Sequence, residues 1–482
     1  MIGLYILLGV VGLILVLLLV ALIRSFVIKD KNLNISPIEV DKTLSEQYAN
    51  EFQKMIQVKT LSYDPKTKDV TAFEAFHKVL QELFPNVYNT MEQTVFEGHS
   101  ILFKWTGKSS DKPIVLMAHQ DVVPASNSGW DYPPFSGHLT EDLIYGRGTL
   151  DTKSTLYGIF KAIDELIGQG FTPEHDIYIS SSTDEETSGF GAHKSVEKLQ
   201  EFGVKPYLVL DEGGAIVRGS LPSVQKPIAL IGVLEKGYAN IKFTAKSAGG
   251  HSSYPPKNSP IARLSAFVQD VENHFPLKTK MIPEVAAIFS EAAPAMKGPY
   301  RFLFGNLWLF KPLLTWLLPK INPFGRALLS TTIAFTMQEG SDAENVIPAE
   351  ASVTANLRIH PIQNIDSSFN VLQKIAKKYD IEAELLEARE ASPISSTSND
   401  AYRYIVKMIM KNYPDVLVSP YVMLGGTDCR YFSEITESAL RFSPVRMDNK
   451  DLKKIHGINE AIPKTCLTEA VLFYKDIIIN HQ

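Results

Sequence analysis

The stretch Pro113-Ile-Val-Leu-Met-Ala-His-Gln-Asp121 decides the fold. Its first six residues are apolar, which is typical of a strand that is buried on both faces of a sheet. A histidine and an acid follow at the point where the strand should end. Two other segments repeat this pattern: Ile177 to Thr183 precedes Glu185, and Tyr207 to Leu210 precedes Asp211. Because the carboxyl ends of strands in an open α/β sheet face the ligand crevice, we expect these polar side chains to lie close together.

The composition indicates a large globular protein. A chain of 482 residues with 45% hydrophobic content exceeds what one core usually organises, so about two domains are expected. The 48 basic and 53 acidic residues nearly balance, and no dense stripe of Lys and Arg occurs, so we expect no nucleic-acid partner. Cys429 and Cys466 are too few for a disulfide framework or a thiolate metal cluster, and we expect both to be buried.

The order of helix and strand signals predicts the fold class. From residue 38 to 237 these signals alternate, which favours an α/β domain with a mostly parallel sheet flanked by helices. Residues 238–390 follow a different, α+β pattern and are interpreted as an inserted second domain. Residues 391–482 resume the first pattern and complete the catalytic domain.

The N-terminus predicts a membrane anchor over residues 1–28. No charged residue occurs from Ile2 to Ile23, a length that suits a membrane-spanning helix. A cleaved signal peptide normally begins with a basic segment, which is missing here, so an uncleaved single-pass anchor is favoured. Arg24, Lys29 and Lys31 follow the span and Asp30 lies among them, so the side of the membrane stays open. The polar stretch from Lys29 to Asp41 is interpreted as a linker.

Within the insertion, residues 302–318 are apolar but contain Lys311 and Pro312 and are short for a span. One interpretation is a buried pair of helices. The other is an exposed apolar surface that contacts the membrane or takes a lipid-like group of the substrate.

The acids and histidines favour a site for two metal ions. Hard oxygen ligands mixed with imidazole suit zinc or a similar divalent ion. Two close ions need a bridging carboxylate, and the candidate is Asp151, which stands between the other ligand groups and at the expected start of a helix. One ion would bind His119 and Asp211, and the other would bind Glu186 and His456.

Two further acids have predicted roles beside the metals. Glu185 would act as the general base and later return its proton to the leaving amine. Asp121 would accept a hydrogen bond from the imidazole of His119 and fix its tautomer. Each of these residues has a non-catalytic alternative. Two adjacent glutamates such as Glu185 and Glu186 usually lie on the surface in contact with water. A lone histidine such as His456 is usually an ordinary surface or packed residue. The buried strand before Glu185 argues against the first of these alternatives.

Four motifs carry a resemblance to a known family: Met117-Ala-His-Gln-Asp-Val-Val-Pro124, Gly146-Arg-Gly-Thr-Leu-Asp-Thr-Lys153, Thr183-Asp-Glu-Glu-Thr187 and Gly249-Gly-His-Ser-Ser253. In this order they resemble the aminoacylase and carboxypeptidase family of dizinc metallohydrolases, over nearly everything after the anchor. Four more motifs look like the branch that contains carboxypeptidase S and the N-fatty-acyl-amino-acid synthase/hydrolase: Phe304-Gly-Asn-Leu-Trp308, Asn345-Val-Ile-Pro348, Asn356-Leu-Arg-Ile-His-Pro361 and Ile455-His-Gly-Ile-Asn-Glu460.

The resemblance implies a zinc exopeptidase-like domain and a ferredoxin-like lid or dimerisation domain, through which a homodimer could form. It also implies the metal ligands and the base given above. His251 and Asn345 would approach the scissile carbonyl, and Arg358, Gly426 and Thr427 would meet the carboxylate of the substrate, a group that the planar guanidinium of arginine matches. His251 follows two glycines and its alternative role is in a turn, while Arg358 could instead pair with a structural acid.

The sequence therefore predicts a membrane-anchored dizinc hydrolase. It would release an amino acid from a peptide C-terminus or from an N-acyl amino acid. The alternative is a non-catalytic, membrane-tethered binding protein with the same fold. That alternative predicts missing ligands or a replaced base, and neither occurs in the motifs.

Overall fold

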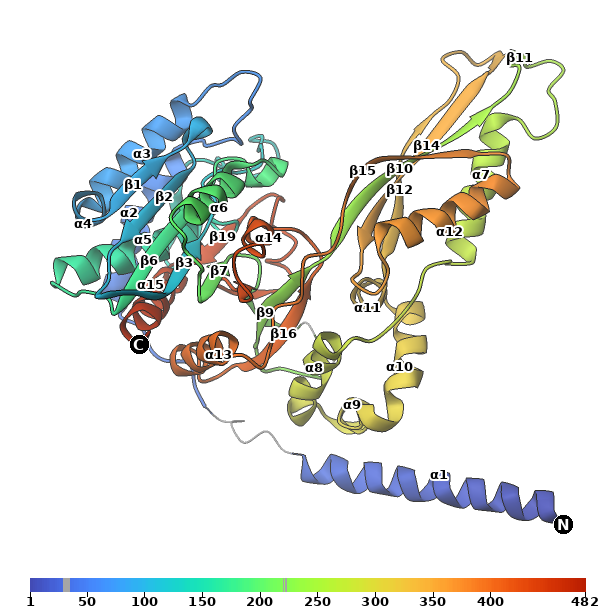
Figure 1. Ribbon diagram of the computed structural model, residues 1–482, viewed down its shortest axis with the longest axis horizontal. Helices are drawn as coiled ribbons and strands as arrows, with labels where there is room; N and C mark the ends of the chain where they lie inside the picture. Colours follow the sequence, from blue (N-terminus) through green and yellow to red (C-terminus); the bar gives the residue numbers. More distant parts are fainter. Residues whose placement is uncertain (29–34, 220, 222) are drawn as a thin grey trace.

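The computed structural model describes residues 1–28, 35–219, 221 and 223–482. Lys29 and Lys31, on which the prediction of membrane orientation depends, lie outside the described residues, as does part of the expected linker. Figure 1 shows a catalytic body, a second sheet that extends away from it, and an N-terminal helix beside the second unit.

The catalytic body is built on a ten-stranded sheet, in which the predicted buried strands lie side by side. At its centre β3 (Ser109–Met117) pairs in parallel with β6 (His175–Ser181) and with β7 (Leu208–Asp211). The next strand, β17 (Ala439–Arg441), is parallel to β7. β6 and β7 are buried along their whole length, and β3 is buried from Pro113 to Met117, as predicted for this apolar stretch.

The rest of this sheet mixes strand directions. Antiparallel pairs join β6 to β2 (Ile101–Trp105), β2 to β1 (Glu92–Val95), and β9 (Ile228–Glu235) to both β17 and β8 (Ile216–Arg218). Parallel pairs join β16 (Leu417–Met423) to β9 and β18 (Arg446–Asp448) to β8. The sheet is therefore mixed, whereas a mostly parallel sheet was predicted: its central strands are parallel, and both parallel and antiparallel pairs occur toward the β18 edge. A short separate sheet joins β4 (His138–Leu139), β5 (Leu143–Tyr145) and β19 (Ala461–Pro463).

Helices complete the catalytic body. They are α2 (Lys42–Gln57), α3 (Thr71–Leu83), α4 (Pro85–Thr90), α5 (Lys153–Gly168), α6 (Gly191–Glu201), α13 (Asp400–Asn412), α14 (Cys429–Phe432) and α15 (Lys464–Ile479). Asp41 caps α2, since its carboxylate accepts bonds from the backbone of Thr43 at 2.8 Å and Leu44 at 3.3 Å. Helix α5 is buried along most of its length, where it packs against α15, α4 and α2. Both cysteines are buried, as predicted, and the structure shows that both are free.

The second unit has a four-stranded antiparallel sheet in the order β12-β14-β10-β15. Its elements follow the chain as β10 (Gly237–Lys246), α7 (Pro260–Asn273), β12 (Thr332–Glu339), β14 (Glu350–Ile359), α12 (Ile365–Lys378) and β15 (Glu382–Arg389). This order of strands and helices is that of a ferredoxin-like unit. Burial alternates along β10, because one face of the strand packs on α7 while the other stays partly exposed. At the tip, β11 (Gly250–His251) pairs with β13 (Val346–Ile347).

Additional helices lie between α7 and β12: α8 (Pro283–Ala292), α9 (Gly298–Phe304), α10 (Leu307–Ile321) and α11 (Pro323–Leu329). Helices α8 and α11 supply apolar side chains to a core that includes Leu234 and Val422 of the catalytic body. Most of α10 is not in this core, since Leu314 is its buried residue while Trp308 is 50% and Trp316 59% exposed. The expectation of a fully buried helix pair is therefore wrong for α10, and the exposed-surface interpretation describes it.

The N-terminal helix α1 (Ile2–Val27) is long and apolar enough to cross a membrane, a property that an N-terminal signal sequence shares. Most of its side chains are exposed, and Ala21 and Ser25 are buried. There the buried amide of Asn306, at the start of α10, donates to the carbonyl oxygen of Ala21 at 3.0 Å and to the hydroxyl of Ser25 at 3.2 Å.

Candidate metal centre

The candidate centre lies at the carboxyl ends of β3, β6 and β7. His119 follows β3, the Glu185–Glu186 pair follows β6 in the short helix η2 (Glu185–Thr187), and Glu212 follows β7. Asp151 comes from the loop before α5, and its peptide bond to Thr152 is cis. His456 comes from the loop between β18 and β19. Segments far apart in the sequence therefore meet at one edge of the sheet, as expected for an α/β crevice.

Asp151 stands between the two histidines. Its Oδ1 lies 3.1 Å from Nε2 of His119, and its Oδ2 lies 3.1 Å from Nε2 of His456. The same nitrogen of His456 lies 2.9 Å from Oε2 of Glu186. Each oxygen of Asp151 thus faces a different imidazole, which is the arrangement that a bridging carboxylate requires.

Two groups of potential ligands share Asp151. One contains His119, Asp151 and Glu212, and the other contains Asp151, Glu186 and His456; within each group the ligand atoms lie within 4.8 Å of one another. The second group is the predicted one. In the first group, Glu212 stands where Asp211 was predicted.

The hydrogen bonds of Asp211 favour Glu212 over the predicted Asp211 as the ligand. One carboxylate oxygen accepts from the backbone N–H of Glu212 at 2.8 Å, and the other accepts from the N–H of Cys429 at 2.8 Å. Adjacent side chains of an extended chain point in opposite directions, so only one of two consecutive acids can face the crevice. The sequence signal was present in the pair Asp211-Glu212, but the strand alone did not tell which acid faces the metals.

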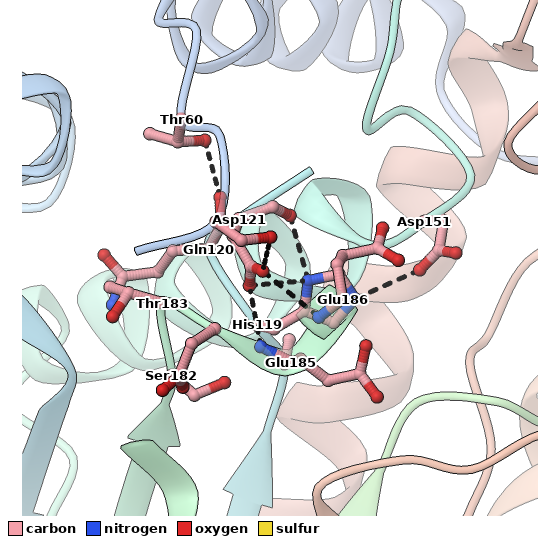
Figure 2. Close-up of polar contacts among 12 residues, drawn as sticks. Thr60, His119, Gln120, Asp121, Asp151, Ser182, Thr183, Glu185 and Glu186 are labelled. Atoms are coloured by element: carbon pink, nitrogen blue, oxygen red, sulfur yellow. Dashed lines mark hydrogen bonds and ion pairs between the residues drawn. The ribbon is translucent and has the colours of Figure 1, made fainter. Parts of the chain in front are cut away.

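Asp121 positions both His119 and the predicted base, Glu185 (Figure 2). Nδ1 of His119 donates to the backbone oxygen of Asp121 at 2.9 Å and lies 3.4 Å from its Oδ1, which leaves Nε2 for a metal. The Asp121 carboxylate accepts from the backbone N–H of Glu185 at 3.3 Å and of Glu186 at 3.2 Å. Ser62 donates a third bond to it at 2.7 Å. Asp121 therefore fixes the tautomer mainly through its backbone, and its side chain holds the turn that carries both glutamates.

A buried ion pair joins the loops of Asp151 and His456, which sequence reasoning did not assign to the site. Arg147 contacts Glu460 at 2.5 Å and donates to the carbonyl oxygen of Gly457 at 2.9 Å. The other oxygen of Glu460 accepts from the N–H groups of Leu150 at 2.7 Å and Asp151 at 3.2 Å. Both charged residues lie in the motifs quoted above, and motif membership was the signal that could have found them.

Several acidic groups lie close together at this centre, and their mutual repulsion is of the kind that bound cations would reduce. Burial, with Asp151 and Asp211 nearby, raises the pKa of Glu212 well above its usual value. Hydrogen bonds to Asp151 and Glu186 raise the pKa of His456 to about 10. Burial alone would lower the pKa of His119, but the bonds to Asp121 and Asp151 outweigh it and raise that pKa.

The donor set fits two divalent ions. Among the described residues, Oε1 of Glu186 is buried without a hydrogen-bond partner, so it is free for a ligand. Imidazole nitrogens and carboxylate oxygens in groups that share an aspartate are suited to a pair of zinc ions.

Glu185 has the electrostatics of a proton carrier. Burial raises its pKa well above the usual value, and the nearby acids Asp428, Asp151 and Asp121 act in the same direction. A carboxyl group with a raised pKa can take a proton from water and return it to a leaving group near neutral pH.

The predicted substrate-binding residues are not gathered at this centre. His251 and Asn345 are exposed at the tip of the second unit, where Ser252 donates to the backbone oxygen of Asn345 at 3.0 Å. The tip, labelled β11, lies far from the catalytic body in Figure 1. Arg358 is exposed on β14. The hydroxyl and N–H of Thr427 donate to the buried Glu235 at 2.5 and 3.0 Å, so its side chain has a structural partner. Within one chain, the predicted approach of His251 and Asn345 to the metals is not seen.

Gly426 lies beside a group of arginines. A Cβ at Gly426 would lie 3.2 Å from the Arg430 guanidinium and 3.5 Å from that of Arg389, both on the same side of the loop as Glu235. Arg389 is at the end of β15, where the chain leaves the second unit, and burial together with Arg430 lowers its pKa. Sequence reasoning did not identify these two arginines.

The comparisons with known proteins agree with the geometry. The model of peptidase family M20/M25/M40 matches residues 115–480. The N-fatty-acyl-amino acid synthase/hydrolase PM20D1 of Xenopus tropicalis is 36% identical over 481 residues, which is 98% of this chain and 93% of the relative. A probable carboxypeptidase S-like protein 2 of Dictyostelium discoideum is 33% identical over 93% of this chain and 88% of its own.

A solved structure shares the fold. The M20 family metallo-carboxypeptidase Sso-CP2 from Sulfolobus solfataricus superposes with a TM-score of 0.63 at 18% identity, over 91% of this chain and 99% of its own.

Proposed function

The chain belongs to peptidase family M20/M25/M40, and on that premise we propose that it hydrolyses N-acyl amino acids at a membrane surface. The chain is a zinc-dependent hydrolase of amide bonds, of the carboxypeptidase or N-acyl-amino-acid hydrolase type. The choice of N-acyl amino acids rests on the similarity to the PM20D1 relatives and on the exposed apolar surface of α10.

The placement of Asp151 between the two imidazoles carries the proposal. We assign His119, Asp151 and Glu212 to one ion and Asp151, Glu186 and His456 to the other. Two bound zinc ions would acidify a water molecule and polarise the amide carbonyl. Glu185 would take the proton of that water and deliver it to the nitrogen of the leaving amino acid. Asp121 would hold the turn of Glu185 in place through its two backbone bonds.

The amino acid half of the substrate carries a carboxylate, which needs a cation. Arg389 and Arg430, beside Gly426, are the candidates that the geometry favours, and the exposed Arg358 is a third. His251 and Asn345 are too far along the second unit to act on the metals of their own chain. Their exposure supports a homodimer in which the second unit of one copy reaches the centre of the other.

Helix α1 would hold the enzyme at the membrane as an uncleaved single-pass anchor. The helix has 26 residues, and an 18-residue window within it has a mean hydropathy of 3.4, which supports this role. The site would then stand close to a bilayer, in which an N-acyl amino acid with a long chain would concentrate.

Removal of the metals tests the proposed function. Purified full-length protein in detergent should hydrolyse an N-acyl amino acid, and treatment with a zinc chelator should lower kcat/KM by about a hundredfold or more. Added zinc should restore the activity, which should reach its plateau at about two zinc ions per chain. Full hydrolysis by protein that metal analysis shows to be zinc-free would contradict the proposal.

A further inference from the structure

An apolar cavity of about 170 Å³ opens directly beside the metal ligands. Asp151 and Glu212 form its polar end. The remaining wall is mostly apolar and includes Leu230, Val217, Tyr421, Ile455, Leu452 and Phe324. These residues come from β8, β9, β16, the loop of His456 and helix α11, so the cavity lies where the additional helices meet the catalytic body.

Backbone packing fixes one wall of the cavity. Gly213 and Gly214 line it, and Gly213 has a φ of 103°, which favours glycine. A Cβ at Gly213 would lie 2.9 Å from the side chain of Thr427, and one at Gly214 would lie 2.2 Å from the Leu230 carbonyl oxygen. The segment Glu212–Gly214 therefore separates the cavity from the Thr427 loop, beside which Arg389 and Arg430 lie.

The charges on the two sides of this segment distinguish the two halves of the substrate. The cavity lining contains the acids Asp151 and Glu212 and, among the described residues, neither lysine nor arginine. A carboxylate placed there would be repelled and would lose its hydration without gaining a partner. The uncharged acyl half gains from burial against the same wall.

We propose that this cavity receives the acyl group of the substrate, and that Phe324 and Leu452 at its rim set the acyl-chain length that the enzyme prefers. The inference rests on the proposed function and adds to it the residues that select the length of the acyl chain. Phe324 and Leu452 both line the cavity and are each 41% exposed, so both side chains are reached by solvent.

The surface outside the rim continues the apolar path. Ile321, at the end of α10, is 65% exposed, and α10 packs against α11, which carries Phe324. A chain too long for the cavity would pass Phe324 and lie on this surface. Each methylene that enters the cavity should raise kcat/KM about fourfold, and the gain per methylene should fall once the cavity is filled.

Chain-length series measured on three proteins test this inference. The substrates are N-acyl derivatives of one amino acid, from acetyl to palmitoyl, and the proteins are wild type, Phe324→Ala and Leu452→Trp. Leu452→Trp should fill the rim and lower kcat/KM for long chains about tenfold or more, and leave the acetyl substrate within about twofold. Phe324→Ala should make kcat/KM rise less steeply with acyl-chain length than it does in the wild type. Phe202→Ala, which removes an aromatic ring that is 54% exposed and outside the cavity, is the matched control.

The outcomes separate this inference from the proposed function. If all three proteins hydrolyse the acetyl substrate and show the same dependence of kcat/KM on acyl-chain length, the inference is overturned and the proposed function stands. A change in preference for the amino acid side chain, with the acyl series unchanged, overturns it as well, because the cavity would then hold the other half of the substrate. A wild-type enzyme that cleaves no member of the series overturns the proposed function and the inference with it.

Discussion

Replacing Glu185 with glutamine is expected to lower kcat by about 10²–10⁴-fold while both metal ions stay bound. Glutamine has the same shape as glutamate, but its amide can neither accept the proton of water nor return it to the amine. The backbone N–H of residue 185 would keep its bond to Asp121, so the turn and the neighbouring ligand Glu186 should stay in place. Kinetics with an N-acyl amino acid, together with metal analysis of the same sample, measure both parts of the expectation.

The matched control for Glu185 is Glu201→Gln, which changes an exposed glutamate on α6 whose partner is Lys198. It should leave kcat within about twofold, because an exposed ion pair contributes little. Wild-type kcat in Glu185→Gln would remove the general base from the proposed mechanism. Loss of metal in that variant would instead assign Glu185 to the ligands.

Replacing Glu460 with alanine should have the second large effect, on metal binding and on local stability. Glu460 is fully buried and holds Arg147 and the backbone before Asp151, so its removal leaves a buried guanidinium unpaired. Breaking such a pair costs about 3–5 kcal/mol. The loops of Asp151 and His456 should separate, and the ion between Asp151, Glu186 and His456 should be lost. Hydrogen exchange of residues 146–152 and 455–460, with metal analysis, provides the readout.

A double replacement separates stability from positioning. In Arg147→Met with Glu460→Leu, no buried charge is left unpaired, so much of the lost protection against exchange should return. Metal affinity should stay low, because the backbone N–H groups of Leu150 and Asp151 still lack their acceptor. If the single Glu460→Ala variant kept two metals and wild-type protection, the ion pair would have no part in assembling the centre.

Sequence reasoning found the elements that follow simple patterns. The continuous apolar stretch before His119 predicted a strand that is buried on both faces, and this stretch is the buried end of β3. The comparisons confirm the family, and the structure brings His119, Asp151, Glu186 and His456 together.

The remaining features depend on contacts that local patterns do not encode. Whether Asp211 or Glu212 faces the metals depends on Cys429, whose N–H binds the Asp211 carboxylate from a segment more than 200 residues away. The sheet is mixed because β2 is antiparallel to β6 and β9 is antiparallel to β17, and strand direction has no local sequence signal. The exposure of α10 depends on how it packs on its neighbours, since its apolar composition suited a buried helix equally well.

The most direct test of the account is a crystal structure of the zinc-loaded enzyme, with anomalous scattering recorded at the zinc edge. Two peaks about 3.5–4 Å apart are expected on either side of the Asp151 carboxylate, one beside His119 and Glu212 and the other beside Glu186 and His456. A single peak, or a pair that Asp151 does not bridge, would contradict the claim that this aspartate is shared by two catalytic ions.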